Sequence, residues 1–574
     1  MAIKTQKIVA DLETTTTPED VRAWGVCAVD IDSLETVYLG NELDGFMEWL
    51  KDKNTVCYFH NAKFDLEFVL PYLFHNQYKH STTAREKHFT TLITDDGVVY
   101  SLTVYFKKEN KKWRKVTFYD SLKKLPFKAA KIAEDFKLPD KKLTIDYDAP
   151  RPRGHELTEE EKAYIINDCR IIAQALKIQF AEGLKKMTNA SDAMHGYKTI
   201  ISPGQFDRWF PELPIAIDDE IRRAYKGGYV YLNPKYKNKR GLQGFTVDIN
   251  SLYPWTMYEC LLPYSYPVYF EGEPEPDDTY PLYIVHFKCC FELKPGHLPT
   301  LQLKKNYRFI ETEYLTTSEI KIKPGVYENE PVEMVLTSVD YELFKDHYNI
   351  SDETYINGYK FKGAHNMFTE YIDYWMHIKE TTTGARRSLS KLMLNSLYGR
   401  YALTTRPLEK WPRMDADGVV RYDIINEKYC EEHKLPPPEI RPPVYTALAA
   451  FVTSYARNKT IRSAQKVYDR FIYADTDSLS IIGYDVPEEL DIHPTRLGAW
   501  KHEGEFTDSI FLRAKTYMKT VDGEIKVTCA GMPDNVKEDV TYDNFHYGST
   551  FEGKLEPKRY PGGVVLMKKT FTIK

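Results

Sequence analysis

Acidic side chains stand at the ends of three apolar, strand-like runs, and this arrangement limits how the chain can fold. The runs end with Asp11 and Glu13, with Asp248, and with Asp475 and Asp477. Side chains alternate across a strand, so Asp11 and Glu13 share one face while Leu12 turns to the core. Carboxylates withdrawn from water are costly unless a positive partner balances them. The chain must therefore fold so that these strand ends meet a cation or stay in solvent.

Length and composition indicate several globular domains. The chain has 574 residues, more than one hydrophobic core usually holds, so we expect about three or four domains. Apolar residues at 42% and charged residues at 28% are typical of a soluble globular chain and exclude wholesale disorder. The formal charge of −5 argues against non-specific coating of polyanions but permits a local basic channel. The aromatic share of 14% fits stacking on flat ligands and an aromatic core equally well.

No segment predicts a membrane span or a secretory leader. The opening residues lack an apolar signal core, and no run approaches the roughly 18 apolar residues of a membrane span. The eight cysteines are scattered without a C-x-x-C pair, which argues against zinc ribbons and disulfide frameworks and favours a reducing cytoplasm. We therefore expect a monomer that has no membrane partner.

Apolar periodicity divides the chain into an α/β part and a longer mixed part. Strand and helix patterns alternate to about residue 189, and a capping box of Thr158 and Glu161 predicts the start of a long helix. Beyond it we expect strands at YKGGYVYL and GFTVDIN, a β-rich insertion at 260–365, helix at 376–401, a loop-rich insertion from 404 and a basic tail from 548. The expected fold class is multidomain, α/β and α+β.

A first group of acids suits metal-dependent hydrolysis. Asp65 follows a second predicted strand, and Asp168 lies on the long helix with Tyr164 one turn earlier on the same face. With Asp11 and Glu13, these acids could hold two Mg²⁺ or Mn²⁺ ions about 4 Å apart for phosphodiester hydrolysis, and Tyr164 would orient the attacking water. Each acid alone also fits a simpler interpretation, as a solvated strand end or a surface helix acid.

A second group suits nucleotidyl transfer. Asp475 and Asp477 bracket Thr476 at the turn of a predicted hairpin, and Asp248 ends another strand. Asp is common in turns for its own backbone bonding, so YADTDS alone fits an ordinary turn equally well. Together the three acids are candidates for a second two-metal site, which would lower the pKa of a primer 3′-hydroxyl and bind pyrophosphate.

A cationic helix face lies between these acids in the sequence. Arg387, Lys391, Asn395 and Tyr398 share one face of a predicted helix that Gly399 could close as a C-cap. The two cations could bind a triphosphate, and Tyr398 could support the incoming base. An amphipathic surface helix is the alternative.

Two further residues would complete a nucleotide site. Lys379, upstream of the helix, adds a cation for the triphosphate. Tyr253 follows Asp248 closely and would stand near the sugar, where its ring would collide with a ribose 2′-hydroxyl and select deoxynucleotides. A core tyrosine is the alternative interpretation.

Taken in order, these segments resemble the family B DNA polymerases, and more narrowly the protein-primed replicative polymerases of small tailed bacteriophages. The resemblance rests on DLET at Asp11, HNAKFD at Asp65, YIIND at Asp168, YKGG at Tyr225, DINSLYP at Asp248, KLMLNSLYG at Lys391, YADTDS at Asp475 and KTY at Lys515. One such motif is a weak signal, whereas all of them in this order are highly specific.

The resemblance implies an RNase H-like 3′–5′ exonuclease domain followed by a right-hand polymerase with two insertions. The implied parts are the exonuclease domain (1–189), the first part of the palm (190–259), an insertion similar to one that docks a priming terminal protein (260–365), the fingers (366–403), a second insertion for strand displacement and processivity (404–440), the second part of the palm (441–547) and the thumb (548–574). The second insertion is longer than is usual in such relatives.

The resemblance also implies roles for individual residues. Lys142 would assist exonuclease catalysis, and Ile249 joins Asp248, Asp475 and Asp477 as a metal-ligand position. The residues implied to hold a frayed single-stranded end are Thr14, His60, Asn61, Phe64, Ser121, Leu122 and Tyr147. Those implied to contact DNA, primer or priming protein are Tyr225, Gly227, Gly228, Thr453, Arg457, Lys515 and Tyr517. The implied cofactor is Mg²⁺, which Mn²⁺ can replace, with two ions in each active site.

The expected function is therefore DNA-directed synthesis of viral DNA, protein-primed, processive and strand-displacing, with 3′–5′ proofreading. The expected partners are template and primer DNA, deoxynucleoside triphosphates and a priming terminal protein, in the cytoplasm of an infected host cell. One alternative is a standalone structure-specific DNA nuclease, in which the later acids are only structural. Another is a non-catalytic nucleic-acid-binding scaffold, which would have no reason to keep so many costly clustered carboxylates.

Overall fold

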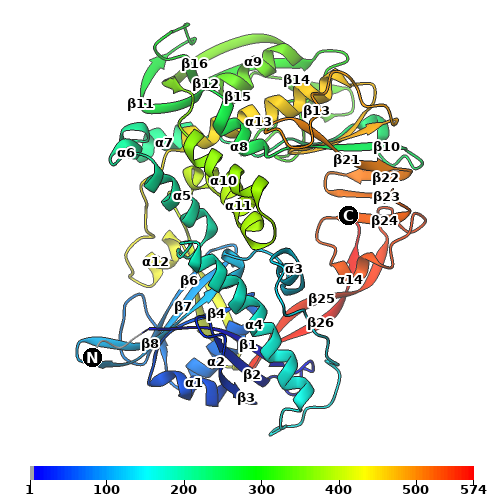
Figure 1. Ribbon diagram of the computed structural model, residues 1–574. Coiled ribbons are helices and arrows are strands. Elements are labelled where there is room, and N and C mark those ends of the chain that lie inside the picture. The colour runs from blue at the N-terminus through cyan, green and yellow to red at the C-terminus, as the bar shows by residue number, and fades with distance from the viewer. Residues whose placement is uncertain (1–4, 305) are drawn as a thin grey trace.

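A mixed sheet of eight strands organises the N-terminal part of the chain, which lies at the bottom of Figure 1. The computed structural model describes residues 5–304 and 306–574. Residues 1–4, where the predicted exonuclease domain begins, and Lys305, in the first predicted insertion, lie outside the described residues.

The strand order of this sheet places the first acids at its centre. The order is β3 (Thr36–Gly40), β2 (Ala23–Asp30), β1 (Gln6–Thr14), β4 (Asn54–Phe59), β8 (Lys112–Asp120), β7 (Val99–Glu109), β6 (His88–Ile93) and β5 (Lys79–His80). Strands β1, β4 and β8 run parallel to one another. The carboxyl ends of parallel strands meet at one edge of a sheet, so the end of β1 faces the loops that follow β4 and β8.

Helices cover this sheet and carry the remaining acids of the first group. They are α1 (Leu43–Lys51), α2 (Ala62–His75), η1 (Ser121–Lys123), α3 (Ala129–Asp135) and α4 (Glu159–Ala181), and α5 (Asn189–Ile200) leads out of the domain. The predicted capping box is confirmed, because the Thr158 hydroxyl accepts the Glu161 N–H and the Glu161 carboxylate accepts the Thr158 N–H. Helix α4 packs against β1 and β2 and therefore presents one face to the end of β1.

A second, antiparallel sheet organises the larger part of the chain. Its order is β21 (Trp500–Phe506), β10 (Gly244–Ile249), β20 (Ser478–Ile482), β19 (Phe471–Asp475) and β9 (Val230–Leu232). Helix α13 (Thr446–Lys466) packs against α7 (Ile215–Arg222), α8 (Leu252–Glu259) and α9 (Ser338–His347) beside this sheet. The short elements α6 (Gln205–Trp209) and η2 (Pro234–Tyr236) lie in the connections. The predicted hairpin at FIYADTDSLSII is confirmed as β19 and β20.

The helical segment predicted at 376–401 consists of two helices and a 3-10 turn. They are α10 (Thr369–Thr381), α11 (Ala385–Ser396) and η3 (Tyr398–Ala402). Thr382 and Thr383 are β-branched and Gly384 has φ +63°, so this stretch favours a break over a continuous helix. The prediction that Gly399 closes the helix is wrong. Leu397 and Tyr401 are both fully buried, and the chain tightens into η3 between them instead of reversing at a glycine.

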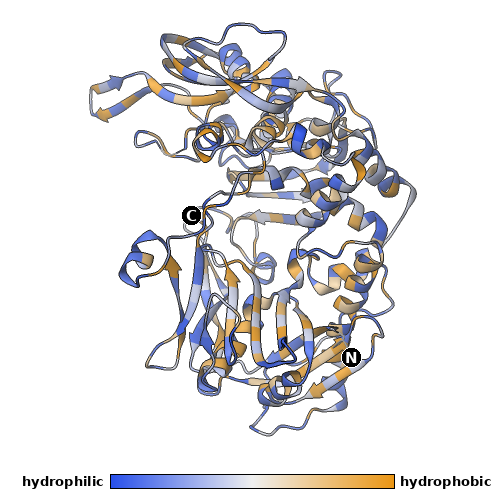
Figure 2. Cartoon of the chain, turned by 90° about the vertical axis from the view of Figure 1, so that its left-hand side faces the viewer, coloured by the Kyte–Doolittle hydropathy of each residue, from blue (hydrophilic) through white to orange (hydrophobic). Residues whose placement is uncertain are grey.

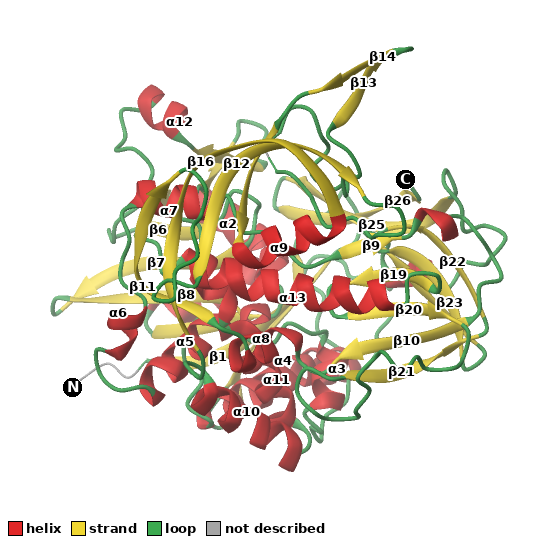
Figure 3. Cartoon of the chain, turned by 90° about the horizontal axis from the view of Figure 1, so that it is seen from above, coloured by secondary structure: helices red, strands yellow, loops and turns green. Residues whose placement is uncertain are grey.

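The β-rich character predicted for residues 260–365 is confirmed. A four-stranded sheet has the order β11 (Leu262–Glu271), β16 (Tyr348–Ala364), β12 (Leu282–Leu293) and β15 (Val332–Thr337). The hairpin of β13 (Glu319–Lys323) and β14 (Val326–Asn329) projects from the rest of the molecule (Figure 3).

The loop-rich interpretation of residues 404–440 is confirmed in part, because loops flank three regular elements in this segment. A hairpin of β17 (Glu409–Met414) and β18 (Val420–Ile425) is followed by α12 (Glu427–Glu432). The turn DADG is a hairpin signal that the many prolines obscured. The C-terminal elements are β22 (Asp508–Arg513), β23 (Thr516–Val521), β24 (Glu524–Cys529), α14 (Asp534–Lys537), β25 (Thr550–Tyr560) and β26 (Gly563–Thr572).

Several hydrophobic cores hold these parts together. Hydrophobic segments are distributed through both the upper and lower parts of the chain in Figure 2. Val420 of β18 and Val564 of β26 are buried in the core of the N-terminal domain. None of the helices in the described part of the chain is long and apolar enough to cross a bilayer. The predicted multidomain class, α/β and α+β, is confirmed.

Candidate active sites

Three acids of the first group converge at the end of β1. One carboxylate oxygen each of Asp11, Glu13 and Asp168 lies within 4.8 Å of the others. Burial, followed by the charge of Asp168, raises the pKa of Asp11 to about 7, and burial together with Asp11 raises the pKa of Glu13. The buried Oδ1 of Asp168 accepts no hydrogen bond from the described residues. An oxygen-only cluster with an orphaned acceptor is a donor set that fits a hard divalent cation.

Asp65 lies beside this cluster, in the first turn of α2. Its side chain is buried, and its pKa is raised by burial and then by the charge of Asp11. Within the described residues it does not join the group of three. The predicted fourth acid is therefore adjacent to the cluster and separate from its closest contacts.

Lys142 and two tyrosines border the cluster. Lys142 Nζ donates to Asp168 and, over 2.6 Å, to the Tyr164 hydroxyl. The hydroxyls of Tyr164 and Tyr147 are 2.5 Å apart. Tyr164 is buried and Tyr147 is half-exposed, so the pair leads from the acids to the surface. The structure thus places Lys142 and Tyr164 at the cluster of three acids, with Asp65 beside it.

The residues predicted to hold a single strand divide into exposed and buried groups. Thr14, Asn61, Phe64 and Leu122 are at least partly exposed. Ser121 is fully buried and bonds to His60 Nδ1 over 2.9 Å, so direct contact between Ser121 and a strand is not supported. Because His60 Nε2 binds the Phe127 carbonyl, Nδ1 must accept from Ser121, which fixes the ring orientation.

The second group of acids meets at the junction of β10 and β20. Asp248 is paired with Ser478 across the sheet, and the Ile249 N–H donates to the Asp477 carbonyl over 2.7 Å. Burial, with Asp477 as the next cause, raises the pKa of Asp248 to about 7, and burial also raises the pKa of Asp477. Both acids line a cavity of about 820 Å³.

The nucleotide-binding residues predicted from the sequence line the same cavity. These are Tyr253, Lys379, Arg387, Lys391 and Tyr398, and the predicted ligand position Ile249 lines it as well. Burial, followed by the charges of Lys391 and Arg387, lowers the pKa of Lys379. Lys379, Arg387 and Lys391 repel one another and share this cavity with Asp248 and Asp477. Such a lining suits a polyanion that is bound together with divalent cations.

Tyr253 and Tyr398 form one aromatic surface in this cavity. Their ring centroids are 4.2 Å apart and the planes are inclined by 28°. The two rings were predicted to contact the sugar and the base separately. In the structure each ring positions the other.

Asp475 does not join Asp248 and Asp477 at the cavity. Lys515 Nζ donates to both Asp475 oxygens, over 2.7 and 2.9 Å, and the Tyr473 hydroxyl accepts the Lys515 N–H. The predicted grouping of three acids is therefore not found among the described residues. Lys515, predicted to contact a primer terminus, pairs with an acid of the hairpin instead, and Tyr517 packs on Tyr473.

The YKGG loop packs on the turn between these acids. A Cβ atom on Gly228 would lie 2.6 Å from Thr476 Cγ2, so a side chain there would displace the turn. Arg457 donates to the carbonyls of Lys226 and Gly227 and pairs with the buried Asp340.

Two α13 residues that were predicted to contact primer or priming protein are buried in this structure, and their contact with either partner stays a prediction. Arg457 is buried and engaged with the protein backbone and Asp340. Thr453 is buried and bonds to carbonyls of its own helix. Tyr225 and Gly227 remain accessible.

Two residues of β21 line the cavity and were missed in the sequence. Lys501 is the neighbour of Asp248 in the sheet, and Glu503 lies 2.6 Å from Lys501 and contributes to the raised pKa of Asp248. Their i, i+2 spacing indicates a common strand face. Nothing in the sequence indicates that this strand pairs with β10, because the two strands are separated by some 250 residues along the chain.

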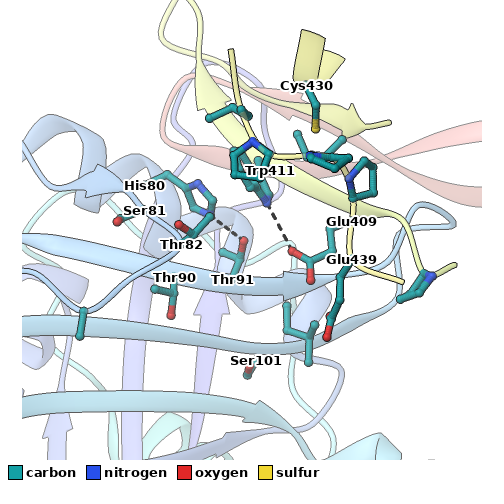
Figure 4. Close-up of a pocket in the computed structure, with 18 of the residues that line it drawn as sticks. His80, Ser81, Thr82, Thr90, Thr91, Ser101, Glu409, Trp411, Cys430 and Glu439 are labelled. Carbon is teal, nitrogen blue, oxygen red and sulfur yellow. Dashed lines mark hydrogen bonds between the residues drawn. The ribbon is translucent and has the colours of Figure 1, made fainter. Parts of the chain in front are cut away.

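Another cavity, of about 610 Å³, lies away from both groups of acids. It separates the sheet edge at β5–β7 from residues 407–439, and Figure 4 shows His80 of the sheet edge beside Trp411 of the second insertion, both in its lining. The two rings are 5.1 Å apart between centroids. The cavity marks where the second insertion packs against the N-terminal domain.

Comparisons with known proteins cover both groups of acids. The family described as DNA polymerase type B, organellar and viral, matches residues 47–153 and 149–492. The DNA polymerase of Bacillus phage B103 is 43% identical over 98% of this chain and 99% of its own length. That of Bacillus phage phi29 is 41% identical over 98% of each.

A solved structure matches the fold from end to end. Phi29 DNA polymerase in complex with primer–template DNA has a TM-score of 0.92 and 40% identity, and the match covers 100% of both chains. The implied arrangement of exonuclease domain, palm, fingers and thumb is thereby confirmed. With this likeness over its full length, the chain belongs to the organellar and viral family B DNA polymerases.

Proposed function

We propose that this protein replicates phage DNA inside an infected cell, extending a primer at the Asp248–Asp477 cavity and trimming mispaired ends at the Asp11–Glu13–Asp168 cluster. The observation that carries the proposal is the cavity, whose lining combines four acids, Asp248 and Asp477 among them, with four cations. Its volume of about 820 Å³ is in the range of small-molecule sites. Relatives named DNA polymerase match over 98% of the chain, which favours synthesis over the standalone nuclease and the scaffold.

The residues of the cavity suggest how substrates are oriented. Arg387, Lys391 and Lys379 would bind the triphosphate, and Arg387 also donates to the Lys379 carbonyl, which joins α10 to α11. Asp248, Asp477 and the Ile249 carbonyl would hold Mg²⁺ or Mn²⁺. When bound, the ions would supply the Lewis acidity that activates the 3′-hydroxyl and stabilises the leaving pyrophosphate.

The first cluster supports a 3′–5′ exonuclease. Asp11, Glu13 and Asp168, with Asp65 beside them, would hold the ions of this site. Lys142 and Tyr164 hydrogen-bond at its edge and would orient the attacking water. The partly exposed residues around the cluster, Asn61 and Phe64 among them, would hold the frayed strand.

Protein priming, strand displacement and processivity belong to the same proposal. The sheet of residues 260–365 has exposed apolar side chains, including Tyr266, Tyr269 and Tyr327, which suit docking of a priming protein. Residues 404–440 and the thumb hairpin of β25 and β26 both reach the N-terminal domain, which suits a protein that surrounds its DNA.

Asp477→Ala should abolish primer extension and leave digestion of single-stranded DNA near normal, because only the polymerase cavity loses a ligand. Asp485→Ala is the matched control, since Asp485 follows the same hairpin but is 85% exposed. Both activities are measured on one labelled oligonucleotide. Loss of both in Asp477→Ala would contradict two independent sites.

Asp11→Ala combined with Glu13→Ala should impair the trimming of 3′ ends and leave primer extension intact. Trimming of a mismatched 3′ end should fall by at least about 100-fold, since the cluster loses two of its three acids, while extension of a paired primer persists. Gel analysis of a mismatched primer without nucleotides measures this. Unchanged trimming would place the nuclease elsewhere.

Tyr253→Val should admit ribonucleotides, because the smaller side chain leaves room for a 2′-hydroxyl. The preference for deoxynucleotides is measured as the ratio of kcat/KM values for the two sugars. Tyr398→Phe, which keeps the stacked ring, should retain that preference. Unchanged sugar selection in Tyr253→Val would exclude this role.

With its cognate priming protein, the enzyme should transfer a labelled deoxynucleotide to a hydroxyl side chain of that protein without any DNA primer. Denaturing electrophoresis detects the label on the partner. Asp477→Ala should not transfer the label. An absence of transfer by the unmodified enzyme, which still extends DNA primers, would exclude protein priming.

A further inference from the structure

Two arms of the chain, both distant in sequence from the N-terminal domain, meet on helix α2 of that domain. One is the β17–β18 hairpin of the second insertion, and the other is the β25–β26 thumb hairpin, drawn in red along the blue domain in Figure 1. Each contributes a buried valine, Val420 and Val564, to the same core. Both arms are also joined to the palm by the chain itself, so their meeting closes a ring.

The tips of the two arms touch each other and the domain. A Cβ atom on Gly418, in the β17–β18 turn, would lie 3.5 Å from Pro561 Cβ of the thumb tip. The next residue, Gly562, has φ +92° and approaches the Val21 carbonyl so closely that a Cβ would lie 2.7 Å from it. The thumb tip is therefore seated against the backbone of the N-terminal domain.

One acid joins all three parts. Glu67 of α2 accepts two hydrogen bonds from Arg559 of the thumb, over 2.8 and 2.7 Å, and one from the Tyr422 hydroxyl of the second insertion, over 3.2 Å. The Arg559 guanidinium also lies 4.8 Å from the centroid of the Tyr422 ring. We propose that Glu67, Arg559 and Tyr422 form a clasp that keeps this ring closed during synthesis.

Because the clasp is largely buried, the loss of one of its charged partners is costly. The Glu67 side chain is 7% exposed and that of Arg559 is 39% exposed. A bidentate pair of this kind fixes geometry, and removal of the cation leaves a buried carboxylate without its counter-charge. Opening the ring separates Glu67 from both partners, whereas the exposed Lys128–Asp534 pair at the base of the thumb loses little on separation.

The clasp lies outside both active sites, so it acts on retention of DNA and not on chemistry. None of its residues lines the nucleotide cavity or belongs to the first acid cluster. The inference rests on the proposed processive synthesis. It assigns that property to three positioning residues.

The test compares product lengths from single binding events on a primed circular template, with excess competitor DNA as a trap. Glu67→Gln and Arg559→Gln should each shorten the products by about tenfold, with Arg559→Gln the more severe. The double variant should be no worse than Arg559→Gln, because the contact is already lost. Single-nucleotide addition and digestion of a short single strand should match the unmodified enzyme.

The control variant is Glu556→Gln on the same thumb strand. Among the described residues Glu556 forms ion pairs with Lys554 and Lys569 of its own hairpin, so product length should be unchanged. Equal shortening in Glu556→Gln would show a general weakness of the hairpin and overturn the clasp. Full-length products from both Glu67→Gln and Arg559→Gln would also overturn it. Short products from the unmodified enzyme would instead refute processive synthesis itself.

A cross-link supplies an independent test. The distance of 3.5 Å between a Cβ atom built on Gly418 and Pro561 Cβ suits a disulfide. Gly418→Cys and Pro561→Cys are therefore introduced together into Glu67→Gln. Oxidation after the protein has bound its template should restore long products, and reductant should shorten them again. A cross-link that forms on a non-reducing gel without restoring product length would overturn the clasp.

Discussion

Repulsion between carboxylates that are held out of water is the constraint on which the rest of this structure depends. At the end of β1 and again at the end of β10, burial, followed by the charge of a neighbouring acid, raises the pKa of Asp11 and of Asp248 to about 7. Each arrangement costs free energy in the absence of a cation, and each is supported by a rigid central strand and a long helix nearby. Such strain is retained where a site must bind metal-coordinated phosphates.

The two sites solve the same electrostatic problem differently. In the N-terminal domain Lys142 lies against Asp168, and one cation serves a group of three acids. In the palm the two acids of the β19–β20 hairpin have different surroundings. Asp475 is neutralised by Lys515, which leaves Asp248 and Asp477 to face the cations of α10 and α11. The division explains why only two of the three predicted acids reach the cavity.

Local sequence patterns predicted those parts of the fold that depend on neighbouring residues. The capping box at Thr158, the α11 face of Arg387, Lys391 and Asn395 and the β19–β20 hairpin follow from short spacings, and the structure confirms them. The pairing of β21 with β10 could not be predicted, because no local signal selects a partner so far along the chain. Lys501 and Glu503 were missed for that reason, and the burial of Ser121 and Thr453 could not be predicted because it follows from tertiary packing.

The placement of Val564 in the core of the N-terminal domain has a consequence for biosynthesis. Val564 is synthesised long after helix α2, yet it packs in the same core as side chains of α2. The core around α2 therefore stays incomplete until Val564 has been synthesised and has folded back onto this domain.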